Sequence, residues 1–471
     1  MHIITRRTSI DVATWSTASQ STGLSCPFGR PTRTLHPALT FCKEDTDTVG
    51  PVTPNSLSID GSRLIRRLNE LGEIGAIEGT IGCARLALTD EDRDGRDLVT
   101  TWMLELGLDI TIDGIGNVIA MMPGFDPDLA PVMTGSHIDT VATGGRYDGN
   151  LGVLAGLEVI ETVLTAIEQG NLELNRPLAV GWFTDEEGAR FQPDMLGSLV
   201  YVGGMPLEDA LEITDRDGLS VGDELDRIGY RGAAPIPGPT PHAFVELHIE
   251  QGPILEDGGI TIGVVEGVQG ISWTELTLIG QSCHAGTTPM RLRHDPGYVA
   301  AAVSTFVRDL TREFGGQQVG TIGALDLVPN LVNVVPSTAT MTVDLRNTDD
   351  EILQQAETRL RGFVAQAAEQ EGVSVETRTL ARFEPVDFDP RVIDLVEQAA
   401  QRHSLTYRRM PSGAGHDAQM FARVCPTAMI FTPSVNGISH NVTEYTEPAD
   451  LEAGANVLLD VMLQLSDKDF L

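Results

Sequence analysis

The chain has 471 residues, with 67 acidic and 32 basic side chains and a formal net charge of −35. This length exceeds what one hydrophobic core usually supports, so we expect two domains. The charge argues against a nucleic-acid partner, because nucleic-acid binders present a basic surface. The sequence has neither an apolar run of about eighteen residues nor the apolar block of a signal peptide, so we expect a cytoplasmic protein without a membrane partner.

The basic residues are almost all arginine, since only Lys43 and Lys468 are lysines. Strong acidity with little lysine indicates adaptation to high salt, where screening makes self-repulsion tolerable. Biased base composition with ordinary acidity is the competing explanation. The five cysteines are scattered and have no C-x-x-C spacing, so they indicate neither a disulfide framework nor a zinc knuckle.

Residues 1–58 are rich in Ser, Thr and Pro and have no periodicity, so we expect a disordered or non-native extension without a catalytic role. The first expected helix begins at Ser62. A second is expected over residues 89–106, where Thr89 can cap the helix and Glu91 and Asp92 favour the positive end of its dipole.

Short apolar runs then alternate with helical stretches. Strands are expected over residues 118–122, 132–134, 178–184 and 244–249, with a helix from Leu151 between the second and the third. This order is typical of an α/β sheet with helices on its faces. Ligands of such sheets bind outside the carboxyl ends of the strands, where most of the polar clusters follow.

The pattern changes at about Gly267. Strands over 272–279, 338–345 and 373–379, helices over 296–312 and from Asp350, and one more short strand before Thr338 give the order βαββαβ of a ferredoxin-like module. Helix 391–402, strand 427–431 and helix 449–465 then resume the α/β alternation. We therefore expect a mixed-sheet catalytic domain of residues 59–266 and 384–471, interrupted by a module of residues 267–383.

Two polar clusters follow the early strands. His137 stands in T-G-S-H-I-D-T-V, where Asp139 can accept the imidazole N–H that faces away from a metal. Asp148 lies in a glycine-flanked loop directly before the helix at Leu151, and glycines let a carboxylate approach an ion closely. Each has an ordinary alternative, a buried His–Asp pair for the first cluster and a helix-capping aspartate for the second.

Glu186 and Glu187 are adjacent at the end of an apolar strand, where two buried carboxylates are costly unless a cation neutralises them. One can ligate a metal while its neighbour takes a proton from water. An exposed acidic turn is the alternative. His248 and His440 complete a set of nitrogen and oxygen ligands that suits zinc or manganese.

The sequence resembles the hydantoinase/carbamoylase branch of the M20 metallopeptidase superfamily from about residue 59 to the C-terminus. The matching motifs are G-S-H-I-D-T-V, D-E-E-G-A-R-F, H-I-E-Q-G-P, H-A-G-T-T-P-M and S-G-A-G-H-D-A. The resemblance implies two divalent ions per subunit, with zinc as the first expectation and manganese, cobalt or nickel as alternatives. Their ligands would be His137 and His248 for one ion, Glu187 and His440 for the other, and Asp148 bridging both. Glu186 would be the general base.

The resemblance also implies roles outside the metal ligands. The inserted module would serve as lid and dimerisation domain of a homodimer, and its His284 would donate to the oxyanion of the tetrahedral intermediate. Ser282 stands where the family usually has alanine. Asn333 and Arg346 would hold a substrate carboxylate, with Gln251 and His416 near the substrate. A strand-end ion pair is the alternative for Arg346.

The activity implied is hydrolysis of a small ureido compound that bears a carboxylate. An N-carbamoyl-L-amino acid is the first expectation, yielding the amino acid, ammonia and carbon dioxide, and allantoate is the second. A dipeptidase or aminoacylase would share the metal-site plan. A non-catalytic binding protein on the same fold would be expected to lack Glu186 or a ligand, and all are present.

Overall fold

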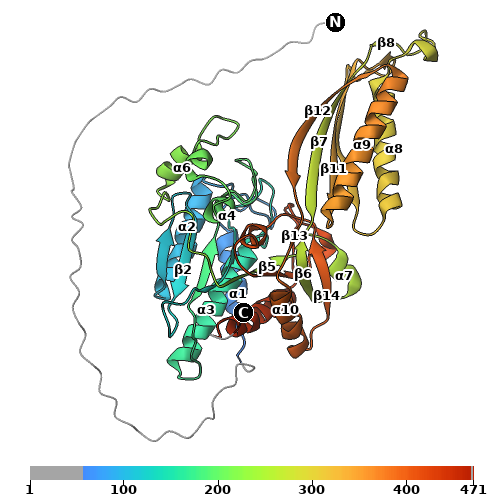
Figure 1. The fold of residues 1–471 in the computed structure, drawn as a ribbon. Coiled ribbons are helices and arrows are strands. Elements are labelled where there is room, and N and C mark those ends of the chain that lie inside the picture. The colour runs from blue at the N-terminus through green and yellow to red at the C-terminus, as the bar shows by residue number, and fades with distance from the viewer. Residues whose placement is uncertain (1–56, 468–469, 471) are drawn as a thin grey trace, which may run out of the picture. The chain divides into compact units, whose positions relative to one another are not determined.

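The computed structural model describes residues 57–467 and residue 470. The extension expected over residues 1–58 lies outside the described residues except for its last two positions. The described chain forms a mixed α/β fold with two sheets of three or more strands (Figure 1). Its buried apolar side chains form two separate clusters.

The larger sheet has nine strands in the order β1-β2-β4-β3-β5-β15-β6-β13, and β14 also pairs with β6. Strands β3, β4, β5 and β15 run parallel to their neighbours within this group. The bounds are β1 (Asp109–Ile112), β2 (Val118–Met122), β3 (Val132–Ser136), β4 (Leu178–Trp182), β5 (Ala243–Ile249), β6 (Ile262–Val268), β13 (Val386–Asp387), β14 (Tyr407–Ser412) and β15 (Thr427–Thr432). Strands β3, β4, β5 and β15 are buried along their whole length, as expected for parallel strands covered on both faces.

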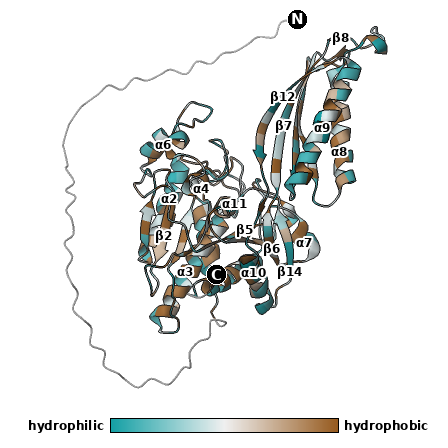
Figure 2. Ribbon diagram, in the orientation of Figure 1, coloured by the Kyte–Doolittle hydropathy of each residue, from teal (hydrophilic) through white to brown (hydrophobic). Residues whose placement is uncertain are grey.

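Helices cover this sheet. The long ones are α1 (Gly61–Gly72), α2 (Asp90–Glu105), α3 (Asn150–Glu168), α10 (Pro390–Arg402) and α12 (Pro448–Leu465), and the short ones are α4 (Leu196–Tyr201), α5 (Leu207–Leu211), α6 (Val221–Ile228), α7 (Ile254–Gly258) and α11 (Asp417–Phe421). Thr89 caps α2 as predicted, because its side chain accepts from the Asp92 amide. Helix α3, drawn in Figure 2 with the hydropathy of each residue, is long and apolar enough to cross a membrane. Most of it is buried against β3, β4, β5, α1 and α12, so we assign it to the core.

The smaller sheet has four antiparallel strands in the order β12-β7-β11-β9. Along the chain its elements are β7 (Gly270–Ile279), α8 (Pro296–Phe314), β9 (Val319–Val328), β11 (Thr338–Asn347), α9 (Asp350–Glu371) and β12 (Ser374–Phe383). Helices α8 and α9 pack together and cover one side of the sheet, with Phe306 stacked on Phe363. The strands β8 (Cys283–His284) and β10 (Val334–Val335) pair beyond the end of β7 (Figure 1).

Some elements differ from the sequence-based expectation. The strand expected to be short before Thr338 is β9, which spans ten residues. Strands β1, β6 and β14 were not anticipated. Strand β6 contains Gly263 and Gly267, which weaken the strand pattern. Gly263 is required by packing, because a Cβ there would lie 2.8 Å from the Phe431 side chain.

Candidate metal centre

The predicted ligands come from five strand ends or loops that meet at one edge of the larger sheet. His137 follows β3, Glu187 follows β4, and His248 is the sixth residue of β5. Asp148 lies in the loop before α3, and His440 lies in the loop between β15 and α12. The fold therefore brings together residues that are as far apart as 137 and 440 in the sequence.

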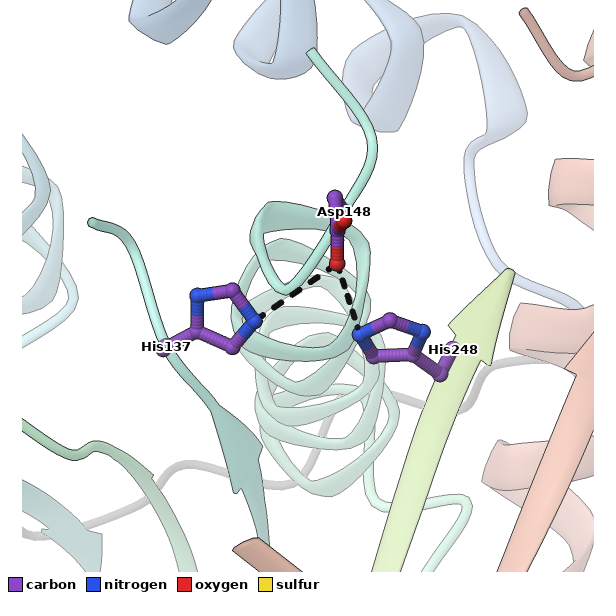
Figure 3. A group of neighbouring side chains, drawn as sticks. All are labelled: His137, Asp148 and His248. Carbon is purple, nitrogen blue, oxygen red and sulfur yellow. Dashed lines mark ion pairs between the residues drawn. The ribbon is translucent and has the colours of Figure 1, made fainter. Parts of the chain in front are cut away.

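Asp148 lies between the imidazoles of His137 and His248 (Figure 3). Its Oδ1 is 3.6 Å from the Nε2 of His137 and 3.2 Å from the Nε2 of His248. Each ring donates its Nδ1–H to a main-chain carbonyl, that of Asp139 for His137 and that of Ile249 for His248, both at 2.9 Å. These bonds turn both Nε2 atoms toward the same carboxylate oxygen, as in a site where imidazoles ligate through Nε2.

The second oxygen of Asp148 faces a different pair of side chains. Its Oδ2 is 3.3 Å from the Nε2 of His440, which is 3.1 Å from Oε2 of Glu187. In a tetrahedral zinc site with bonds of about 2.0–2.1 Å, neighbouring ligand atoms are roughly 3.3 Å apart. The ligand separations of 3.1 to 3.6 Å therefore fit two ions that share Asp148.

Backbone conformation permits this close approach. Gly149 has φ of 65°, and a Cβ at this position would lie 2.3 Å from the Nε2 of His137. Any other residue would be strained there and would collide with the ring. The Gly149 amide nitrogen also lies 3.1 Å from the Nε2 of His248, so the backbone of this loop lies against the second imidazole as well.

The role expected for Asp139 is altered in detail. Its main-chain carbonyl accepts from the His137 ring, whereas the closest carboxylate oxygen is 4.0 Å from Nδ1. The carboxylate instead accepts from the amides of Glu186 and Glu187, at 3.3 and 3.4 Å. Asp139 therefore orients the imidazole through its backbone and the two glutamates through its side chain.

Glu186, the predicted base, lines the cavity and is 7% exposed. Its Oε2 is 3.3 Å from the Nε2 of His137. Burial raises its pKa well above the usual value, although His137 opposes the shift. The neighbouring Glu187 has one buried oxygen, Oε1, without a hydrogen-bond partner among the described residues. An unsatisfied buried carboxylate oxygen is costly, and a cation would satisfy it.

The electrostatics of the cluster favour positive charge. Burial lowers the pKa of His137, but the carboxylates of Glu186 and Asp148 outweigh it and raise the pKa well above the usual value. Hydrogen bonds to Asp148 and Glu187 raise the pKa of His440 to about 10. Burial acts to raise the pKa of Asp148, but hydrogen bonds with three imidazoles hold it well below its ordinary value. Divalent cations would supply this positive charge.

A third group of possible ligands consists of Glu246, His248 and His416. It offers no comparable site, because both oxygens of Glu246 accept hydrogen bonds, from Ser136 and from the Ala418 amide. Burial and the nearby His248 hold the pKa of His416 well below the usual value. His416 therefore faces the cavity as a neutral imidazole.

The ligands open into a cavity of about 170 Å³. Gln251 and Arg346, both predicted substrate contacts, line it together with His416. Gln251 donates to Asp148 Oδ2 at 2.9 Å, so its amide also supports the ligand set. Arg346 reaches the cavity from β11, is paired with Asp344 at 3.0 Å and donates to the Gly413 carbonyl. Arg346 therefore forms the strand-end ion pair that was the alternative interpretation, and it lines the cavity as well.

His284 and Asn333 lie elsewhere. His284 is on β8. Asn333 lies close to it, because its carbonyl accepts from the amide of Ala285, the residue after His284, at 3.0 Å. Ile271 and Trp273, near the first end of β7, line the metal cavity, whereas β8 and β10 extend the ladder beyond the other end. Ten residues at about 3.3 Å each make β7 roughly 30 Å long. His284 and Asn333 therefore do not belong to the cavity of their own chain.

Several residues at the site were not anticipated. Trp273 and Asp194 line the cavity, and the Trp273 indole nitrogen is buried without a partner among the described residues. Ser439 and Glu444 surround Asp148. Both stand in S-H-N-V-T-E around the predicted ligand His440, which was a signal that they could belong to the metal centre. Nothing in their spacing indicated that they contact Asp148.

Comparison with known proteins places these observations in a family. Residues 133–464 match the model of peptidase family M20/M25/M40. The chain is 40% identical over 410 residues to an N-carbamoyl-L-amino-acid amidohydrolase of Rhizobium meliloti, covering 87% of this chain and 97% of that protein. It is 36% identical to the allantoate amidohydrolase of Escherichia coli, covering 82% and 93%. A hydantoinase/carbamoylase family amidase from Burkholderia multivorans superimposes with a TM-score of 0.84 at 45% identity, covering 87% and 99%.

Proposed function

Because the chain belongs to peptidase family M20/M25/M40 and is an amidohydrolase, we propose that it hydrolyses the ureido C–N bond of an N-carbamoyl-L-amino acid. With water, this substrate gives the amino acid, ammonia and carbon dioxide. The observation that supports this most is that each carboxylate oxygen of Asp148 faces its own pair of candidate ligands, two imidazoles at Oδ1 and an imidazole with a carboxylate at Oδ2. The ions would be zinc, with manganese, cobalt or nickel as alternatives that suit the same ligands.

Two divalent ions in this position would polarise the substrate carbonyl and lower the pKa of water. The chain's own contribution begins with Glu186, which accepts a proton from the attacking water and returns it to the departing nitrogen. Its place beside His137 at the cavity wall supports this role. Asp139 holds the amides of Glu186 and Glu187 and so fixes which carboxylate ligates and which moves the proton.

Arg346, which also lines the cavity, would bind the substrate carboxylate. Its guanidinium lies over the Trp273 ring, 5.8 Å from the centroid, and its fork suits a carboxylate. The substrate would share this cation with Asp344. Gln251 and His416 line the same cavity next to Asp148 and His248 and would contact the ureido group.

The four-stranded module would be the inserted ferredoxin-like domain, acting as lid and as the dimerisation surface of a homodimer. Its edge strand β9 and the following loop expose apolar residues, among them Val328, Leu331 and Val332, that a second copy would cover. His284 accepts the amides of Gly286 and Thr287 at Nδ1, which leaves its proton on Nε2. In a dimer this N–H would donate to the oxyanion in the other subunit's site, with Asn333 beside it.

The test is ammonia release from zinc-reconstituted enzyme. The panel comprises N-carbamoyl-L-amino acids of varied side chain, 3-ureidopropionate, allantoate, a dipeptide and an N-acyl amino acid, the last two followed by amine release. Glu186→Gln serves as the inactive control. The highest kcat/KM for a carbamoyl amino acid is expected. Allantoate is the second candidate, because a relative bears that activity in its name. Preference for the dipeptide or acyl compound would overturn the ureido assignment, and a zinc-loaded protein inert on all would favour a binding role.

A further inference from the structure

We propose that Glu444 positions the bridging ligand Asp148 and thereby sets how tightly both ions are held. This inference rests on the proposed two-metal site. Glu444 lies four residues after His440, in the loop that leads to α12, and is 1% exposed. No family motif quoted above includes it. Its contacts are what single it out.

The first oxygen of Glu444 holds the backbone of the loop that carries the bridging ligand. Oε1 accepts from the main-chain amides of Tyr147 at 3.1 Å and of Asp148 at 3.2 Å. The carboxylate therefore fixes the two peptide groups that flank Tyr147, the second of which joins Tyr147 to Asp148. Since the amide of Asp148 is held, the direction in which its side chain leaves the loop is held as well.

The second oxygen holds the same ligand from its other end. The Ser439 hydroxyl donates to Oε2 of Glu444 at 2.8 Å and also lies 3.0 Å from Oδ2 of Asp148. Ser439 directly precedes His440, the ligand that shares Oδ2 of Asp148. The Glu444 side chain thus holds the backbone of Asp148 directly and is linked to the Asp148 carboxylate through Ser439, the residue before the ligand His440.

The environment of Glu444 fits a positioning role better than a role in general stability. Among the described residues no Arg, Lys or His forms an ion pair with it, so its partners are neutral donors of the metal loops. A buried carboxylate without a cation is costly to stability. Gly145 is adapted to this contact, because a Cβ there would lie 2.0 Å from Oε1 of Glu444. The loop sequence is therefore fitted around this carboxylate.

The test measures zinc affinity by competition with a chromogenic chelator, together with thermal melts of the apoprotein. Glu444→Ala should weaken zinc binding roughly 10- to 100-fold, the usual effect of losing a group that orients a ligand. Glu444→Gln should stay within about threefold of wild type, since its carbonyl can accept both amides while its NH₂ donates to Ser439, whose hydroxyl then donates to Asp148.

Asp113→Ala is the matched control. Asp113 is also buried and accepts the amides of Ile115 and Asn117, but it has no contact with a metal ligand. It should lower the apoprotein melting temperature without changing zinc affinity. If Glu444→Ala binds zinc as tightly as wild type, or if all three variants lose zinc in proportion to their lost thermal stability, the positioning role is wrong.

A second variant provides an independent check. Gly145→Ala should weaken zinc binding in the wild type but add no further loss to Glu444→Gly, because the three atoms nearest to the added Cβ are Oε1, Cδ and Cβ of Glu444, at 2.0, 2.2 and 2.5 Å, and glycine at position 444 removes all three. Independent, additive losses would overturn the inference. These outcomes are separate from those of the proposed function. A wild-type protein that binds no zinc contradicts the metal site itself, whereas a zinc protein inert on every ureido compound contradicts only the substrate.

Discussion

The proposed sharing of active sites between two subunits can be tested by complementation. Glu186→Gln removes the base from the metal site of the chain that carries it, and His284→Ala removes the donor that this chain's module would place in the other subunit's site. Each homodimer should have almost no activity. In a mixed dimer, one of the two sites combines Glu186 from one chain with His284 from the other and is intact. With random pairing about half of the dimers are mixed and half of their sites work, so activity should return to roughly a quarter of wild type.

Whether mixing restores activity depends on which subunit's site His284 reaches, and the length of β7 bears on this. Ile271 and Trp273 line the metal cavity at one end of the strand, and His284 lies beyond the other end. Since the strand is roughly 30 Å long, the module would have to turn end over end for His284 to serve its own chain. In that case every site of a mixed dimer would lack one group, and mixing would restore nothing.

The assay is ammonia release by protein from cells that co-express the two variants with different affinity tags. Sequential purification on both tags isolates the mixed dimers, whose activity per dimer should be about half of wild type by the same symmetry. The matched control pairs Glu186→Gln with the double variant that carries both changes. These mixed dimers have no complete site and should remain inactive. Doubly tagged dimers of the first pair that are no more active than this control would refute the shared site.

The remaining predictions concern single groups and the whole surface. Glu186→Gln should keep zinc but lose at least roughly two orders of magnitude in kcat, whereas Glu187→Gln should lose zinc; metal analysis that gives the opposite pattern would reverse the two roles. Arg346→Lys should raise KM for carbamoyl amino acids at least about tenfold with a smaller change in kcat, because lysine cannot form the paired contacts of a guanidinium; an unchanged KM would remove the carboxylate contact. The net charge of −35 should make the melting temperature rise from dilute to molar KCl, since screening relieves repulsion; a flat or falling curve would exclude adaptation to high salt. Burial raises the pKa of Asp113 from 3.8 to about 6, so the folded chain binds this proton more tightly than the unfolded chain does, and the stability it contributes is complete below about pH 4 and lost as the pH rises through 6. Relative to Asp113→Asn, the wild type should therefore lose about 2 kcal/mol of unfolding free energy between pH 4 and pH 7, and denaturant titrations that give a constant difference would contradict the shift.

Sequence reasoning identified the strand-end groups because local rules carry that information. Ligand-type residues after buried parallel strands meet at one sheet edge, and His137, Glu187 and His248 do so. These rules do not predict contacts that depend on the exact path of a loop. Asp139 was expected to use its carboxylate on His137 and uses its carbonyl, because the turn after β3 brings the backbone closer.

Contacts between distant loops could not be predicted in this way. The Glu444 carboxylate reaches the amide of Asp148, which is 296 residues away in sequence. No periodicity or motif encodes such a pairing, because it depends on how α3 and α12 pack. The separation of His284 from its own cavity also needed the observed register of β7, β8 and β10.

The position of β15 in the sheet has a consequence for how the chain folds. β15 is the last strand to be synthesised, yet it lies between β5 and β6 and pairs with both. Until residues 427–432 have left the ribosome, β5, which carries His248, has one edge without a partner. An unpaired apolar edge is open to association with other chains. The growing polypeptide thus exposes the centre of its future sheet until nearly the whole sequence has been translated, and chaperone protection is most needed in that interval.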